Sequence, residues 1–308
     1  MSSWHRCNCF YTNNYFIKLN SGHSAHLTYH HPDTTRMRQE NFYQLRHNLK
    51  ISSITELPVV IDQLNHEYHR RKNLDSELEK AESSISARFK QNSTLHFNDS
   101  PQITKISDRI YRVGPIFKNL PEIKNHLKSF SAHCKSNNLP FAKPNSMNTH
   151  GVLLPKSVFN TDQLTEFFKK LFCENSFFDF KLDSQRVFTV EYGTGKDSDL
   201  DLHFDDSELT ANICLENENG KEGKLFFQKR VENGEHVDES VFDQIENHAI
   251  VHAGKLVHSA ESSFKNRMNL IVWMRDSGVR EKLCRMCGEV PELSDVPGFE
   301  YAGGFKKH

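Results

Sequence analysis

The sequence lacks the long apolar run that a membrane span or a secretion signal requires. Eighteen apolar residues never follow one another, and the start of the chain has no uninterrupted apolar stretch. It also lacks an excess of charge, since 39 basic residues stand against 40 acidic ones in 308. Without a field of one sign, binding to nucleic acid or anionic lipid is not the default expectation. We therefore expect a cytoplasmic or nuclear protein without nucleic-acid or membrane partners.

Cysteine is sparse as well, with seven residues scattered over the whole length. An odd number in this arrangement favours a reduced intracellular chain over a disulfide-stapled secreted one. The pair Cys284-x-x-Cys287 is half of a zinc site, and Cys7-x-Cys9 could supply the other half across the fold. Because the sequence alone cannot bring the two pairs together, reduced cysteines without a metal role are favoured, with structural zinc as the alternative.

What the sequence does have is apolar material for a sizeable core, with 36% hydrophobic residues and 23 Phe. Residues 1–50 show no clear period. From Ile54 to about Phe89, apolar positions recur every three or four residues, which predicts an amphipathic helix with Pro58 in its first turn. We interpret its charged continuation, Arg70 to Glu82, as a solvated helix face, with partner binding as the alternative.

The rest of the chain changes from helical to β-rich patterns. Residues 91–103 are predicted to be a polar linker, and helices are expected at about 120–137 and 161–173. Short β-rich runs then follow at 186–192, 209–215, 224–228, 249–252 and 269–274. These patterns predict an α+β protein whose antiparallel double-stranded β-helix, or jelly roll, is buttressed by N-terminal helices. The predicted regions are 1–105, mainly helical from about 54, a helical support segment 106–180, a β-rich domain 181–280, and a tail 281–308 with the Cys-x-x-Cys.

A His-x-Asp triplet on a strand directs an imidazole and a carboxylate to the same face, where both can bind one ion. The chain has three such triplets, at 31–33, 203–205 and 236–238. Pro32 removes a backbone donor from the first, and the third lies in a hydrophilic stretch, 231–240, that is predicted to be a loop. Only His203 and Asp205 precede a β-rich run, at 210–215.

His258 follows about fifty residues later, and then comes Arg267. Two imidazoles and one carboxylate leave three adjacent positions open on an iron(II) ion, as in non-haem iron oxygenases. We therefore predict that His203, Asp205 and His258 are catalytic metal ligands. A guanidinium at Arg267 suits the distal carboxylate of a dicarboxylate such as 2-oxoglutarate, through two parallel hydrogen bonds. The alternatives are a structural histidine, a zinc site and a surface arginine at a strand edge.

The stretch from Tyr192 to Trp273 resembles the C-terminal oxygenase domain of the prolyl and lysyl hydroxylases. The shared pattern is His-x-Asp, a Thr-x-Asn-Ile-x-Leu strand, a histidine, and an arginine nine or ten residues on. The resemblance implies that Tyr192 and Asn212 help to hold 2-oxoglutarate while Arg267 pairs with its distal carboxylate. A core tyrosine and a strand asparagine satisfied by backbone are the alternatives for the first two.

The same resemblance implies an Fe(II)/2-oxoglutarate dioxygenase domain at 181–280. Such enzymes hydroxylate a substrate, release succinate and CO2, and commonly use L-ascorbate to keep the iron reduced. The substrate is unidentified, and a protein lysyl or prolyl side chain is one candidate. The alternative to an enzyme is a binding module, namely a catalytically inactive jelly roll that engages a protein partner.

Shorter segments extend a resemblance to an animal member of the wider dioxygenase family over nearly the whole chain. These segments are Cys7–Phe10, Asn145–Asn148, Leu182–Ser184 and Leu283–Cys287. One departure concerns the loop Gly220–Leu225, where hydroxylases usually have two adjacent glycines. We expect this loop to differ without damage to the site.

Overall fold

The computed structural model describes residues 4–19, 24–29, 57–90, 94–218, 223–230, 237–296 and 304–306. The predictions on the triplet at 31–33, on His236, on the helix start at Ile54 and on residues 220–222 of the loop lie outside the described residues. The helical segments are η1 (Asn8–Tyr11), α2 (Leu57–Ser84), α3 (Leu120–Ser136), η3 (Pro140–Ala142), α4 (Thr161–Lys169), η4 (Lys170–Glu174) and α5 (Ser277–Arg280).

The strands up to the first predicted iron ligands are β1 (Trp4–Cys7), β2 (Tyr15–Lys18), β3 (Ser24–Leu27), β4 (Gln102–Ser107), β5 (Ile110–Gly114), β6 (Gly151–Leu153), β7 (Ser184–Tyr192) and β8 (Leu200–His203). Those that follow are β9 (Leu209–Asn217), β10 (Leu225–Arg230), β11 (Val237–Phe242), β12 (Ala249–Ala253), β13 (His258–Ala260), β14 (Arg267–Arg275), β15 (Leu293–Val296) and β16 (Phe305–Lys306).

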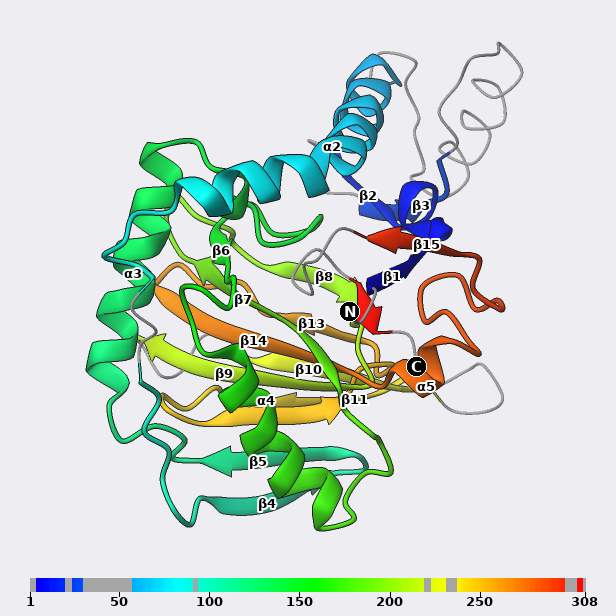
Figure 1. The fold of residues 1–308 in the computed structure, drawn as a ribbon. Coiled ribbons are helices and arrows are strands. Elements are labelled where there is room, and N and C mark those ends of the chain that lie inside the picture. Colours follow the sequence, from blue (N-terminus) through cyan, green and yellow to red (C-terminus); the bar gives the residue numbers. More distant parts are fainter. Residues whose placement is uncertain are drawn as a thin grey trace.

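Two antiparallel sheets form the centre of the molecule (Figure 1). The large sheet has the order β4-β5-β12-β9-β14-β7-β6, and the small sheet has the order β11-β10-β13-β8. From β8 onward the chain alternates between them, because β9, β12 and β14 belong to the large sheet while β8, β10, β11 and β13 belong to the small one. This alternation defines a double-stranded β-helix, so the predicted fold class is confirmed.

The N-terminal helices α3 and α4 buttress the large sheet as predicted. Ser131 of α3 donates to Glu191 of β7 at 2.8 Å, and Gln185 of β7 donates to Asp162 of α4 at 2.6 Å. Because both faces of β7 are covered, all nine of its residues are buried. The predicted helices at 120–137 and 161–173 are confirmed, the second ending in the π-helical turn η4.

The predicted linker at 91–103 is wrong at its end, and its described part is less polar than expected. Leu95 is buried, and β4 begins at Gln102 and forms a hairpin with β5. The turn contains Arg109 in the left-handed region, with a φ of 55°. The hairpin extends the large sheet beyond β12, so segment 106–180 supplies β5 and β6 in addition to helices. The edge strand β4 is mostly exposed and polar, so it carries little apolar patterning, which explains why the sequence did not show it.

The predicted loop at 231–240 is also wrong for its described part. Val237 to Phe242 form β11, which pairs with β10 along its length at the outer edge of the small sheet. An edge strand requires backbone pairing on one side only and tolerates charged residues, so its hydrophilic sequence resembles that of a loop.

Helix α2 is less solvated than its charged sequence suggests. Arg71, Leu74 and Leu78 are buried, because the three-to-four residue spacing of the buried stripe continues through the stretch interpreted as a solvated face. The helix ends at Ser84 instead of Phe89. No helix among the described residues is long and apolar enough to cross a membrane.

The start and the end of the chain meet beside the double-stranded β-helix. Strand β1 pairs antiparallel with β15 and with β16 to form a small three-stranded sheet (Figure 1). The segment that precedes the N-terminal helices is therefore held against the segment that follows the last strand of the large sheet.

Candidate active site

The predicted metal ligands lie together between the two sheets. His203 ends β8, Asp205 follows two residues later, and His258 begins β13, where it is the cross-strand partner of His203. The three ligand atoms lie within 4.8 Å of one another. Nε2 of His203 is 3.5 Å from Oδ1 of Asp205, and Nε2 of His258 is 3.8 Å from Oδ2. A metal with bonds of about 2.1 Å places adjacent ligand atoms ~3 Å apart, so only a small inward shift is needed.

Backbone carbonyls orient both imidazoles. Nδ1 of His203 lies 2.7 Å from the carbonyl oxygen of Asp201, and Nδ1 of His258 lies 2.9 Å from that of Leu256. A proton on Nδ1 donates to each carbonyl, which leaves the Nε2 lone pair of each ring for a metal ion. Both rings therefore present the correct nitrogen before any metal binds.

Asp205 is buried and ionised. Thr210 donates to its Oδ2 at 2.7 Å, and the hydroxyls of Thr210 and Ser207 lie 2.6 Å apart. Burial alone would raise the pKa of Asp205, but His258 and His203 hold that pKa well below its ordinary value. Burial, followed by the charge of His203, lowers the pKa of His258 to about 3. A neutral imidazole at His258 beside an ionised carboxylate is the state that metal binding requires of these two groups.

His252 is a third imidazole at the site that the sequence analysis did not select. Its side chain is fully buried in β12, and Nε2 lies 3.7 Å from Oδ2 of Asp205 with no hydrogen-bond partner in the described part of the chain. Burial lowers its pKa, so the ring is neutral. The sequence offered one indication of this residue, a histidine within the apolar run Ala249–Ala253. A polar side chain in a buried strand is unusual and often has a functional role.

Arg267 lies at the start of β14, directly opposite Tyr192 of β7. Its guanidinium is almost fully buried and stands 4.1 Å from the centre of the Tyr192 ring. Nη1 donates to the carbonyl of Gly223, whereas Nε and Nη2 have no partner among the described residues. A permanently charged group with two unsatisfied buried donors fits a carboxylate ligand, and it excludes the surface-arginine alternative.

A row of amides extends from Arg267 toward the metal ligands. The Gly223 carbonyl also accepts from Gln244 at 3.2 Å, and the Asn269 amide donates to both Gln244 and Asn212. Tyr192, Asn212, Gln244 and Asn269 line the same cavity as the three predicted metal ligands, whereas Arg267 lies behind Tyr192. The cavity thus offers polar groups to a small dicarboxylate, and the guanidinium lies directly behind its Tyr192 wall.

Gln244 and Asn269 are contacts that the sequence analysis missed. Asn269 could have been found, because it lies two residues after Arg267 on a strand and therefore shares its face, as Ile271 and Trp273 do. Gln244 lies in the connection between β11 and β12, where no periodic pattern indicates its direction.

A double-stranded β-helix with two histidines and one carboxylate in its mouth is characteristic of the non-haem iron(II) oxygenases. The donor set fits iron(II), and the orphaned donors of Arg267 fit a co-substrate carboxylate.

Comparison with known proteins agrees with this class. The 2-oxoglutarate and iron-dependent oxygenase domain-containing protein 2 of Xenopus tropicalis is 30% identical over 332 residues, which cover 95% of this chain and 91% of that protein. The protein of the same name from Mus musculus is 28% identical over 96% of this chain and 92% of its own length. The chain belongs to the family of 2-oxoglutarate and iron-dependent oxygenase domain-containing protein 2.

Other comparisons are weaker. No family model matches the chain. A prolyl-4-hydroxylase of Pseudomonas putida aligns with 57% of this chain and 97% of its own at 13% identity and a TM-score of 0.37, which is too distant to support the assignment. Membership of the family therefore rests on the full-length sequence relatives.

Proposed function

We propose that this chain is an Fe(II)- and 2-oxoglutarate-dependent dioxygenase that hydroxylates a C–H bond of its substrate and releases succinate and CO2. The observation that carries the proposal is the convergence of His203, Asp205 and His258, with both Nδ1 atoms bonded to backbone carbonyls and the carboxylate ionised. Bound iron(II) would supply the activation of dioxygen and the oxidation of 2-oxoglutarate; the protein supplies binding and orientation.

Each polar residue of the cavity has a separate task in this proposal. The two histidines and Asp205 would hold the metal ion, whose remaining positions would be available to the co-substrate and dioxygen. Arg267 binds the distal carboxylate of 2-oxoglutarate, and Tyr192 covers the guanidinium and excludes water from it. Asn212 lines the cavity and would help to hold 2-oxoglutarate.

The substrate enters, we infer, beside Trp273. This residue lines the metal cavity and also a second cavity formed with Arg6, Phe10 and Arg186. The indole Nε1 is buried without a hydrogen-bond partner among the described residues, so a substrate acceptor has a donor available at the shared wall. A lysyl or prolyl side chain of a protein, suggested by the hydroxylase pattern, is the substrate to test first.

L-ascorbate would keep the iron reduced, and the cytoplasm or nucleus is the proposed location.

The test is turnover of 2-oxoglutarate by iron-loaded protein. We expect the wild type to release succinate, at a slow rate when no substrate is present. Asp205→Ala should release none, because it lacks one of the proposed metal ligands. Asp108→Ala, at an exposed turn position, is the matched control and should retain turnover. A site that holds zinc and ignores 2-oxoglutarate would instead support the inactive binding module.

A further inference from the structure

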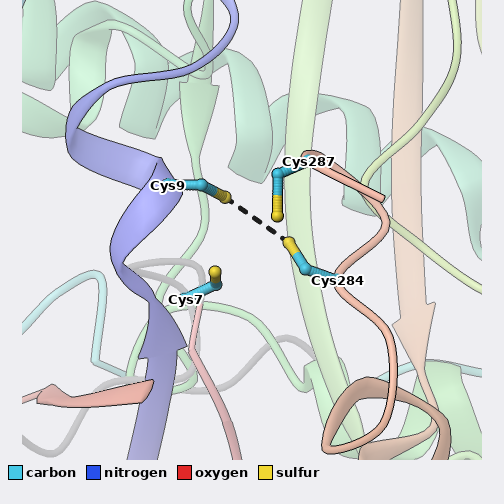
Figure 2. A group of neighbouring side chains, drawn as sticks. All are labelled: Cys7, Cys9, Cys284 and Cys287. Atoms are coloured by element: carbon cyan, nitrogen blue, oxygen red, sulfur yellow. Dashed lines mark hydrogen bonds between the residues drawn. The ribbon is translucent and has the colours of Figure 1, made fainter. Parts of the chain in front are cut away.

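Four cysteines from opposite ends of the chain converge beside the double-stranded β-helix. Cys7 ends β1 and Cys9 lies in η1, while Cys284 and Cys287 belong to the turn after α5. Figure 2 shows the four sulfur atoms directed at one another across a common centre. All four Sγ atoms lie within 4.8 Å of one another, and those of Cys9 and Cys284 are 3.4 Å apart.

This spacing matches a single tetrahedral ion. Zinc–sulfur bonds of about 2.3 Å in a tetrahedron place the sulfur atoms ~3.8 Å apart. A disulfide requires about 2.05 Å, and all seven cysteines are free. An iron–sulfur cluster would put iron and sulfide atoms between the thiolates and spread them farther apart. Four thiolates around one centre leave no open position, which is typical of a structural zinc site.

The turn that bears the second pair is shaped for thiolates. Gly288 adopts a φ of 75°, and its N–H donates to the carbonyl of Cys284 at 2.9 Å, which closes the turn. The backbone N–H groups of Met286 and Cys287 hydrogen-bond to the sulfur of Cys284, and that of Glu289 to the sulfur of Cys287. Backbone donors aimed at sulfur stabilise the negative charge that a zinc-bound thiolate carries.

We infer that Cys7, Cys9, Cys284 and Cys287 bind one structural zinc ion that fastens the two ends of the chain together. The small sheet of β1, β15 and β16 has strands of only two to four residues, too short to be stable without a further link. A metal bond across 275 residues supplies this link.

The zinc turn is also connected to the loop that bears an iron ligand. Arg285, between the two cysteines, donates to Glu208 at 3.0 Å, and Glu208 is three residues from Asp205. Glu208 accepts as well from Arg280 of α5 at 3.0 Å and is almost fully buried. Cys7, Cys9 and Cys284 line the cavity that shares Trp273 with the metal cavity. The zinc ion therefore fixes one wall of the proposed substrate entrance.

The test separates this zinc from any metal in the iron site. In an Asp205→Ala background we expect one zinc ion per chain by elemental analysis, lost on further change of Cys284→Ser. Cys173→Ser, a half-buried cysteine outside the cluster, is the matched control and should retain zinc. Zinc content that is absent from Asp205→Ala, or unchanged by Cys284→Ser, would overturn the inference.

A second measurement does not depend on the folding of a cysteine variant. Titration of the Asp205→Ala protein with a mercurial reagent should release zinc to a chromogenic chelator as the thiols react. Thiols that react without zinc release, or a disulfide between any two of the four in native protein, would contradict the site.

Discussion

At the scale of single residues, Thr210 and the amides of the neighbouring strands contact the groups proposed to bind the metal ion and the co-substrate. His203, Asp205, His258 and Arg267 could be selected because their order along the chain is itself a signal. The hydroxyl of Thr210 and the amides of the neighbouring strands act through contacts between strands, and such contacts depend on register, which one sequence does not reveal.

Thr210→Val tests whether orientation of Asp205 matters. The change preserves shape but removes the hydrogen bond to Oδ2, so affinity for iron(II) should fall about 10- to 100-fold. Anaerobic titration against a competing chelator measures this affinity. Thr165→Val is the matched control, because its buried hydroxyl has no partner in the described structure. Equal iron affinity in both variants would refute the role of Thr210.

Arg267→Lys tests the carboxylate clamp. Lysine keeps the positive charge but cannot form two parallel hydrogen bonds, so 2-oxoglutarate binding should weaken by roughly 10- to 100-fold while iron binding stays unchanged. Calorimetric titration of 2-oxoglutarate into iron-loaded, oxygen-free protein gives the dissociation constant. Arg88→Lys, at an exposed position, is the control and should leave the dissociation constant unchanged. An unchanged dissociation constant for Arg267→Lys would show that Arg267 does not bind 2-oxoglutarate.

At the scale of elements, buried strands were predictable and edge strands were not. Strands β7, β9, β12 and β14 are rich in apolar residues because they lie in the middle of the large sheet. Strands β4 and β11 lie at sheet edges, where one side of the backbone has no partner and the side chains can be polar. Their positions follow from tertiary pairing, which local patterning does not specify.

Helix α2 illustrates a tertiary contact made by charged residues. Glu67 accepts from Arg71 at 2.8 Å, and Arg71 also donates to the carbonyls of Phe10 and Asn13 at 2.7 Å each. Burial alone would raise the pKa of Glu67, but Arg70, Lys143 and Arg71 hold that pKa at about 2. The buried Glu67–Arg71 ion pair therefore holds the segment from Phe10 to Asn13 against α2.

Glu67→Gln should destabilise the protein by about 3 kcal/mol at neutral pH, because it leaves Arg71 buried without its charge partner. The folded-state pKa lies below the ordinary 4.5, so the stabilisation is complete above that pH and is lost as pH falls toward about 2. Urea denaturation across this window should show a steeper loss for the wild type than for Glu67→Gln. Glu79→Gln, on the exposed face of α2, should behave like the wild type; parallel curves for all three proteins would contradict the account.

At the scale of the whole molecule, the double-stranded β-helix holds the candidate iron site and the paired chain ends form a neighbouring wall. Trp273 belongs to both cavities, and Arg285 connects the cysteine turn to the loop that bears Asp205. This arrangement could not be derived from the sequence, because it joins residues 275 positions apart. It places the two proposed metal sites on either side of one entrance.

The most direct test of the central claim is simultaneous binding of iron(II) and 2-oxoglutarate. Oxygen-free protein loaded with iron(II) should develop the visible charge-transfer absorption of a 2-oxo acid chelated to iron when 2-oxoglutarate is added, and Asp205→Ala should not. The wild type should then release succinate on admission of oxygen. Iron-loaded wild-type protein that shows neither the absorption nor succinate would contradict the account.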